Sequence, residues 1–184
     1  MTGRSPRWEF HAVPDPVAGL KAGYQGIYFD LLGRDDPRLN HRLEIRGEDP
    51  ETRDGWHRAL LVTPWQGFFA YIPADPEDPT GLPAADELEA DEEGRVAPGS
   101  ELGLDFGGRT REVEVAYDPR VGHHLVELLL RDTGAFADTE EALAWARTVA
   151  ASREGREDPA PAGETGPRQV SRRDLLRGRV GGRK

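Results

Sequence analysis

Apolar residues recur at helical spacing near the start of the chain. The stripe follows a 3.6-residue period and consists of Val17, Leu20, Tyr24, Ile27, Tyr28 and Leu31. Asp15 and Pro16 stand just before it. Both residue types are favoured where a helix begins, because Asp accepts hydrogen bonds from unpaired N–H groups and Pro lacks a donor that would be unpaired anyway. The pattern predicts a helix from residue 16 to Gly33, and its internal glycines mean that it must pack on a sheet to be stable.

Six short segments then show the alternation or the continuous apolar runs that are typical of strands. They cover residues 41–46, 56–63, 67–72, 101–106, 110–117 and 125–130. Gly107 and Gly108 join two of these segments as a hairpin, and residues 63–66 form a second hairpin or a kinked corner. Short strands connected by tight turns predict a mostly antiparallel sheet.

A second helix is predicted after the last strand. Asp138, with Glu141 three residues later, resembles a capping box that opens a helix running to residue 151. From residue 153 the chain is rich in proline, glycine and charge, and it cannot bury a core. The expected fold class is therefore α+β, with a mostly antiparallel sheet packed against an N-terminal and a C-terminal helix, followed by a disordered tail.

The chain divides into four predicted parts, and its charge follows the same division. The parts are a flexible N-terminal arm (residues 1–14), one α+β domain (15–152), a disordered linker (153–170) and a basic C-terminal motif (171–184). The formal net charge is −10, but 15 basic and 29 acidic residues lie up to Ser152, against 9 and 5 after it. An acidic body excludes nucleic acid as its partner, because phosphate binding needs a basic surface.

Several classes of protein are excluded by residue types and runs that the sequence lacks. It contains no cysteine, which excludes disulfides, thiolate catalysis, iron–sulfur clusters and cysteine-bound zinc. Its apolar runs fall far short of the ~20 residues of a membrane span, and its first residues lack the apolar core of a signal peptide. We therefore expect a cytoplasmic protein without stable membrane insertion. The sequence also has no Walker loop, no G-x-G-x-x-G and no G-x-S-x-G motif, so we expect no bound cofactor and no catalytic residues.

Two adjacent histidines are the best candidates for metal ligands. His123 and His124 lie at the entry to a predicted strand, with carboxylates nearby in the sequence. Adjacent strand residues point to opposite faces, so the two imidazoles are not expected to converge on one ion. A metal-handling accessory protein or small metalloenzyme that uses this pair is kept as the alternative function. The carboxylates of Asp105, Glu112 and Glu114 are expected on the solvated face of the later hairpin.

An aromatic cluster surrounds the proline between two of the predicted strands. A buried core corner would give this pattern, and so would a rigid apolar groove that binds a partner peptide with Trp65 as its anchor. The candidate partner-binding residues of the cluster are Thr63, Pro64, Trp65, Phe68 and Phe69.

A second candidate partner-binding element lies in the basic C-terminal motif. Paired arginines stand beside paired leucines, at Arg172, Arg173, Leu175 and Leu176. A purely solvated basic tail would not need the leucines. The preceding linker of about 18 residues has a span of roughly 20–25 Å, so the motif could contact its own domain or a docked partner.

These motifs resemble those of the HybE family, the assembly chaperones of nickel–iron hydrogenases. The resemblance runs from about Val17 to Val180 and includes D-P-x-L-N at residues 36–40, L-V-T-P-W ending at Trp65, and S-R-R-x-L-L-x-G-R from Ser171. It implies a non-enzymatic cytoplasmic chaperone for hydrogenase assembly or maturation. The implied partners are the large subunit, the small subunit or both, before export or complex formation. The twin-arginine signal peptide of the small subunit is a further candidate partner.

The chain departs from the family pattern on one later strand. Family members commonly carry a Cys-Ser-Leu-x-Ser-Pro stretch there, whereas residues 125–132 contain neither cysteine nor Ser-Pro. The closing Ser-Arg-Arg motif also resembles a twin-arginine signal. This suggests the hypothesis that the tail imitates the signal of the partner and occupies the same groove until it is displaced.

Overall fold

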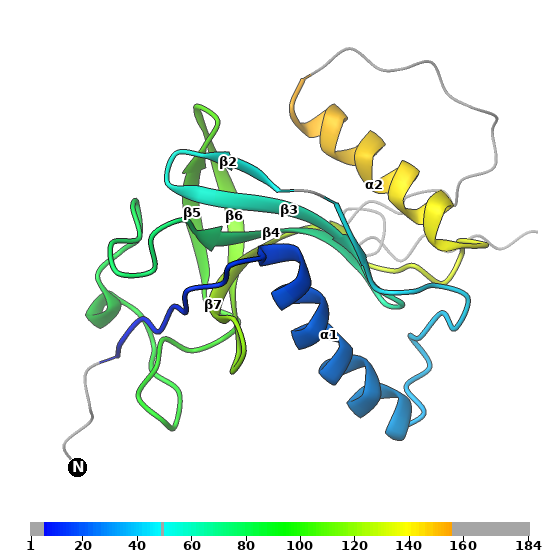
Figure 1. The fold of residues 1–184 in the computed structure, drawn as a ribbon, viewed down its shortest axis with the longest axis horizontal. Helices are drawn as coiled ribbons and strands as arrows, with labels where there is room; N and C mark the ends of the chain where they lie inside the picture. Colours follow the sequence, from blue (N-terminus) through cyan, green and yellow to red (C-terminus); the bar gives the residue numbers. More distant parts are fainter. Residues whose placement is uncertain (1–5, 49, 156–184) are drawn as a thin grey trace, which may run out of the picture.

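One antiparallel sheet runs through the molecule and has a helix on each face (Figure 1). The computed structural model describes residues 6–48 and 50–155, and within these ranges the sheet has seven strands in the order β1-β3-β4-β7-β6-β5, with β2 paired to β3. The strands are β1 (Arg46–Gly47), β2 (Glu51–Arg53), β3 (Trp56–Val62), β4 (Gly67–Pro73), β5 (Glu101–Phe106), β6 (Arg109–Asp118) and β7 (Gly122–Leu130). The predicted α+β fold class is confirmed.

Helix α1 (Pro16–Gly33) begins and ends where the sequence predicts. The Asp15 side chain accepts a hydrogen bond from the Ala18 N–H at 2.9 Å and caps the first turn. Leu20 and Tyr24 pack on one face of β3 and β4. Their buried neighbours on these strands are Ala59, Leu61, Phe68, Ala70 and Ile72.

Only the first part of α1 is covered by the sheet. Ile27, which the apolar stripe places on the buried side, is 38% exposed, and Phe29 and Leu32 are 60% and 43% exposed. The helix runs past the sheet towards its C-terminal end (Figure 1). The apolar stripe is therefore fully buried only at Leu20 and Tyr24, and Ile27 is left exposed.

Helix α2 (Thr139–Arg153) covers the opposite face of the sheet (Figure 1). Asp138 caps the helix as predicted and accepts from the Glu141 N–H at 2.9 Å, while the Glu141 carboxylate reaches back one residue past the cap and accepts from the Ala137 N–H at 2.7 Å. Its buried side packs with Leu43, Leu60, Val62, Leu129 and Leu130. Neither helix of the described ranges is both long and apolar enough to cross a membrane.

The predicted strand at residues 41–46 is largely wrong. In the described chain only Arg46 and Gly47 pair with β3, as the short strand β1. The residues before them form a loop whose N–H groups bond within the loop or to side chains instead of to a strand; the Leu43 N–H donates to the Asn40 carbonyl at 3.0 Å. The Glu44 N–H, for example, donates to the Thr139 hydroxyl at 2.9 Å.

The described part of the predicted flexible arm, residues 6–14, makes specific contacts with the domain. The His123 N–H donates to the Glu9 carbonyl at 2.7 Å, and the Tyr117 hydroxyl donates to the Glu9 carboxylate at 2.7 Å. Trp8 packs against a third buried cluster on β4 to β7. These contacts depend on partners far along the chain, which the local sequence pattern does not reveal.

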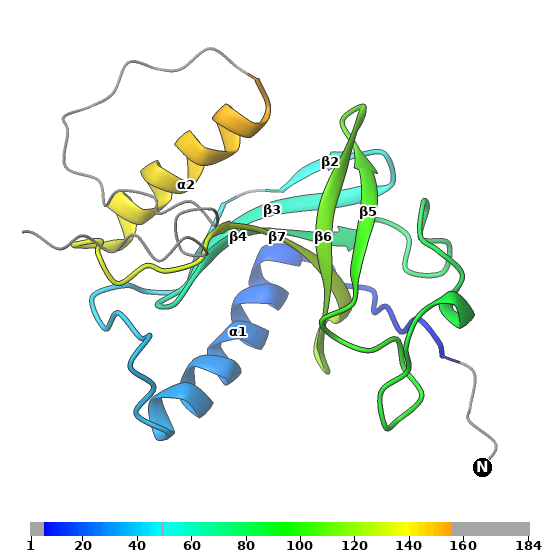
Figure 2. The ribbon, with the colours of Figure 1, turned by 180° about the vertical axis from the view of Figure 1, so that it is seen from behind.

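Strands β6 and β7 pair over only part of their lengths. β6 pairs with β7 from Glu114 to Asp118, and with β5 from Arg109 to Glu114. β7 pairs with β4 along Leu125 to Leu130. Residues 109–113 of β6 therefore do not pair with β7, and the two strands separate there, as Figure 2 shows.

Candidate functional site

The buried amide of Asn40 joins three loops at one end of the sheet. Its side-chain Nδ2 donates to the carbonyl oxygens of Thr133 and Phe136, both at 2.8 Å. Its backbone N–H donates to the Pro64 carbonyl at 2.7 Å. Buried polar groups are tolerated when such bonds are made and are costly when they are not. Asn40 therefore holds its own loop and the loop after β7 against the turn that contains Trp65.

Thr63 fixes the turn between β3 and β4. Its N–H donates to the Gln66 carbonyl at 2.8 Å, and its hydroxyl accepts from the Gln66 N–H at 3.1 Å. The Thr133 hydroxyl donates to the Thr63 carbonyl at 3.3 Å. Thr63 and Pro64 are buried, whereas Trp65 is half-buried. The first two residues therefore position Trp65 and present it at the surface.

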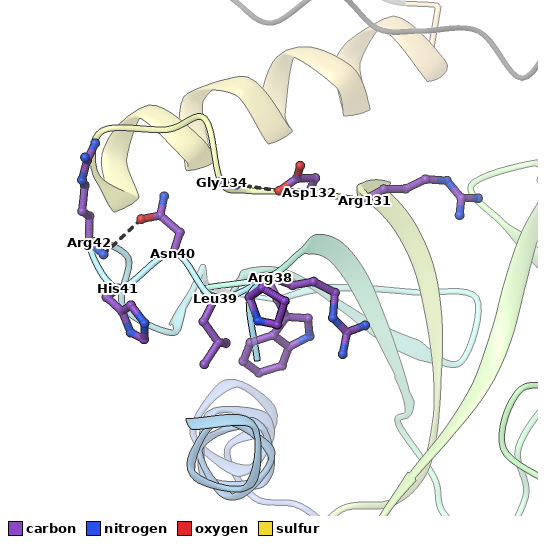
Figure 3. Close-up of a pocket in the computed structure, with 10 residues that line it drawn as sticks. Arg38, Leu39, Asn40, His41, Arg42, Arg131, Asp132 and Gly134 are labelled. Atoms are coloured by element: carbon purple, nitrogen blue, oxygen red, sulfur yellow. Dashed lines mark hydrogen bonds between the residues drawn. The ribbon is translucent and has the colours of Figure 1, made fainter. Parts of the chain in front are cut away.

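A hollow of about 750 Å³ opens beside Trp65. We call it the Trp65 hollow, and its walls are residues 37–42, Trp65, and residues 131, 132 and 134. Figure 3 shows the first and last of these segments facing each other across the hollow. The indole of Trp65 also stacks on Tyr24 of α1, with ring centroids 6.3 Å apart. The hollow thus lies where α1, the turn and two loops meet.

Basic side chains dominate the rim of the Trp65 hollow. Arg38 binds Asp36 through two contacts of 2.9 and 2.6 Å, and these hydrogen bonds lower the pKa of Asp36 to about 2. Arg42 and Arg131 have no ion-pair partner among the residues that the structure describes. Arg38 and Arg131 extend in the same direction from their two loops (Figure 3). A cavity lined by an indole and by unpaired guanidinium groups suits a segment that carries both an apolar side chain and a carboxylate.

The two phenylalanines of the predicted groove lie on opposite faces of β4. Phe68 is fully buried under α1, with its ring centroid 4.9 Å from that of Tyr24. Phe69 packs on the α2 side, where the Arg58 guanidinium lies 4.4 Å from its ring centroid. The structure therefore does not bring Phe69 and Trp65 into one groove, and Phe68 has no surface that a partner could contact.

His123 and His124 point to opposite faces of β7, as their adjacency predicts. The Nδ1 of His123 accepts from the Glu9 N–H at 2.8 Å, and its Nε2 donates to the Val96 carbonyl at 3.0 Å. The Nε2 of His124 accepts from the Tyr24 hydroxyl at 3.1 Å. Both rings are buried and are bound by groups of the chain itself. In the part of the chain described, no three His, Cys, Asp or Glu side chains gather where they could hold a metal ion.

A second cavity, of about 990 Å³, lies where β6 and β7 part. We call it the β6–β7 crevice; residues 109–114 of β6 and 126–128 of β7 form its two sides, with Tyr24 and Gln66 at one end. Glu112 and Glu114 are exposed here, as the alternation along the strand predicts. Arg131 lines both cavities, so the crevice and the Trp65 hollow adjoin.

A network of buried charges lies on the α2 side of the crevice. Glu127 accepts from the Tyr71 hydroxyl at 2.6 Å, and guanidinium nitrogens of Arg153 and Arg111 lie 3.6 and 4.0 Å from it. Glu154 lies 3.7 Å from Arg111. Burial, together with the charge of Glu127, raises the pKa of Tyr71, so its hydroxyl stays protonated and donates. No local sequence pattern predicts this network, because its members come from separate elements.

Asn40, Arg42 and Arg131 were also not predicted as site residues from the sequence. Asn40 closes the D-P-x-L-N motif, which was the available signal, but nothing in the local pattern marks the two arginines. Of the predicted partner-binding residues, Arg172, Arg173, Leu175 and Leu176 lie outside the described residues, as does the linker from residue 156.

Comparisons with known proteins bear on the whole domain. The family model described as "[NiFe]-hydrogenase assembly, chaperone, HybE" matches residues 15–178. Among solved structures, the chain matches the solution structure of HybE from Escherichia coli, with 15% sequence identity, a TM-score of 0.49, and coverage of 100% of this chain and 97% of that chain. No curated protein matches the chain. The range matched by the family model contains all the residues that line the two cavities.

Proposed function

The chain belongs to the HybE family of [NiFe]-hydrogenase assembly chaperones, and from this premise we propose that it binds a hydrogenase subunit at the Trp65 hollow. The client is the large or the small subunit, held in the cytoplasm before export or complex formation. The twin-arginine signal peptide of the small subunit is proposed as one of the bound segments. The protein supplies binding surfaces and no chemical step.

The observation that supports this site is the meeting of two sequence motifs in space. The segments at residues 36–40 and 63–65 are far apart along the chain, yet the Asn40 N–H donates to the Pro64 carbonyl at 2.7 Å. Together they leave Trp65 half-buried in the wall of a hollow that unpaired arginines also line. Tryptophan and arginine are the residue types whose truncation most often costs an interface its binding free energy.

The charges of the two cavities favour different parts of a client. In the Trp65 hollow, Arg42 and Arg131 line the same cavity as the indole and would bind carboxylates of a client whose apolar side chain contacts Trp65. In the β6–β7 crevice, Glu112 and Glu114 would bind the arginines of a signal peptide. We therefore propose that a client segment passes from one cavity to the other beside Arg131.

Co-purification of each hydrogenase subunit with tagged Trp65→Ala protein tests the proposal. Truncating an aromatic anchor costs about 2–4 kcal/mol of binding free energy, or roughly 30- to 1,000-fold in Kd. The matched control is Trp145→Ala, since Trp145 is 36% exposed on α2 and lines neither cavity. The client should be lost from Trp65→Ala and retained by Trp145→Ala.

Trp65 also packs on Tyr24, so thermal unfolding must first show that the variant is folded. The double charge reversal Arg42→Glu/Arg131→Glu leaves this packing intact and should weaken client binding as well. If both folded variants still co-purify with the subunits as the wild type does, the client binds elsewhere and the proposal is wrong.

A further inference from the structure

The β6–β7 crevice leaves one edge of β6 without a neighbouring strand. Val115 makes both of its backbone hydrogen bonds with residues just before β5. Backbone groups alternate in direction along an antiparallel strand, so the N–H and C=O groups of Thr110 and Glu112 point the other way, into the crevice. Pairing between β6 and β7 stops at Glu114. Within the described residues, no strand therefore lies beside this edge.

Three carboxylates line the crevice on its α1 side. Glu101 lies directly opposite Glu114 in the β5–β6 register. Glu112 precedes Glu114 by two residues on β6 and so lies on the same face. Among the described residues these three side chains have neither an ion pair nor a hydrogen bond. Like charges directly opposite each other destabilise a pair of strands. Cations placed among them would therefore stabilise the hairpin.

The α2 side of the crevice already contains cations. Arg111 is only 9% exposed and lies close to Glu127 and Glu154; its Nε finds no hydrogen-bond partner in the described part of the chain. Arg153, the last residue of α2, extends to β7 and donates to the Leu128 carbonyl at 2.9 Å. A strand added beside β6 would therefore need positive side chains on its α1 face and none on its α2 face.

The C-terminal motif of this chain contains one segment with that pattern. Residues 176–180 read Leu-Arg-Gly-Arg-Val. In an extended strand Arg177 and Arg179 would share one face, with only a glycine between them on the other. Residues two apart on a strand are separated by about 6.8 Å, which is also the separation expected for Glu112 and Glu114. The two arginines therefore match the two carboxylates in spacing and in charge.

The described chain also ends beside the crevice. Arg109, the first residue of β6, donates to the Arg153 carbonyl at 3.0 Å, and the described residues end at Gly155. The tether from Gly155 to Arg177 has about 22 residues and an r.m.s. span of about 26 Å, against about 20 Å for the free edge of β6. Such a tether gives an effective concentration in the millimolar range. Even a weak contact would therefore be substantially occupied.

We propose that residues 176–180 of this chain add to the free edge of β6 as a strand in the β6–β7 crevice, with their two arginines among Glu101, Glu112 and Glu114. The segment then occupies the place proposed above for the arginines of a client, so a client must displace it. That consequence rests on the proposed function, whereas the docking itself depends on this chain alone.

Hydrogen exchange of the full-length protein tests the docking with no client present. The probes are the backbone amides of Thr110 and Glu112, which the added strand would cover. The variant Arg177→Ala/Arg179→Ala should speed their exchange by at least about 5-fold. The variant Glu112→Gln/Glu114→Gln, which removes the charges at almost constant shape, should do the same.

The matched control is Arg172→Ala/Arg173→Ala in the full chain. It removes the same charge from adjacent positions, which would point to opposite faces of a strand, and it should leave the exchange of both amides unchanged. Equal exchange in the wild type and in Arg177→Ala/Arg179→Ala would overturn the proposal by showing an empty crevice. If the two double variants speed the exchange of both amides equally, the proposal is overturned, because the tail is then attracted by its overall charge and not by the position of its arginines.

A hydrogenase subunit is the competing occupant. If the two amides become protected only when a subunit is added, the client fills the crevice and the tail does not, which contradicts the docking but not the proposed function. Conversely, the two amides could be protected in the wild type and not in Arg177→Ala/Arg179→Ala, while no subunit is retained in co-purification. That result would support the docking and contradict the client proposal.

Discussion

At the scale of single residues, buried polar side chains hold distant parts of this chaperone together. Asn40 ties three loops at the Trp65 hollow. His123 ties the segment at Glu9 to β7, and His124 ties β7 to α1 through the Tyr24 hydroxyl. Losing one partner of such a bond leaves the other buried and unpaired, at a cost of about 1–3 kcal/mol. These residues therefore stabilise the packing of separate elements against one another, and not a single helix or strand.

His124 should make the stability of the fold depend on pH. Burial lowers the pKa of its imidazole to about 4, against about 6.5 for an exposed histidine. Between these values the unfolded chain binds a proton that the folded chain does not. The contribution of His124 is therefore complete above about pH 6.5 and is lost as the pH falls towards 4, by about 3 kcal/mol. Burial also lowers the pKa of His123, which acts in the same direction.

Urea unfolding at pH 7 and at pH 4.5 measures this dependence. His124→Gln should be less stable than the wild type at pH 7 but should lose less stability on acidification. His41→Gln, at an exposed position, is the control and should keep the wild-type dependence. A His124→Gln protein that loses as much stability as the wild type would show that this imidazole does not respond to pH as its burial requires.

At the scale of elements, α1 depends on a close approach to the β6–β7 turn. A Cβ added at Gly23 would lie 2.9 Å from Cγ of Asp118, whereas one added at Gly33 meets nothing within 4 Å. Gly23→Ala should therefore destabilise the protein by about 1–3 kcal/mol through overpacking. Gly33→Ala should be neutral or stabilising by up to about 1 kcal/mol, since alanine is the better helix former. Thermal unfolding compares them, and equal stabilities of the two variants would contradict this packing of α1.

Elements with local signals were predicted well from the sequence. Both helix caps, at Asp15 and Asp138, and the hairpin at Gly107 and Gly108 follow from residues close together in the chain. Both hairpin glycines have positive φ, which other residues rarely adopt. Local capping and turn chemistry were sufficient for these elements.

The predicted strand at residues 41–46 failed because alternation does not distinguish a strand from a packed loop. Leu43 packs in the cluster under α2, and Ile45 packs in the cluster under α1. The two side chains are buried on different sides of the sheet, not on one face of a strand. Their spacing alone carries no information about which neighbours they meet.

The candidate site was predicted in part, for a related reason. Trp65 stands at a turn that the proline makes visible in the sequence. The contact between Asn40 and Pro64, the approach of Arg131, and the parting of β6 from β7 all depend on residues far apart in the chain. Strand register is set by such contacts as well as by alternation. The sequence therefore identified Trp65 but neither of the cavities beside it.

At the scale of the whole molecule, two adjoining cavities present different charges. The Trp65 hollow presents arginines, whereas the β6–β7 crevice presents carboxylates on its α1 side and arginines on its α2 side. The acidic body and the basic end of the sequence fit this arrangement, because the end can enter the crevice while the hollow stays open. A client that binds both cavities would then have to displace the tail.

Site-specific photocrosslinking tests the placement of the client most directly. A photoreactive benzoylphenylalanine in place of His41 lies at the Trp65 hollow, and the same group in place of Trp145 lies on α2, outside both cavities. With purified hydrogenase subunits present, illumination should crosslink a subunit from position 41 and not from position 145. Capture from position 145 alone, or equal capture from both positions, would contradict binding at the Trp65 hollow.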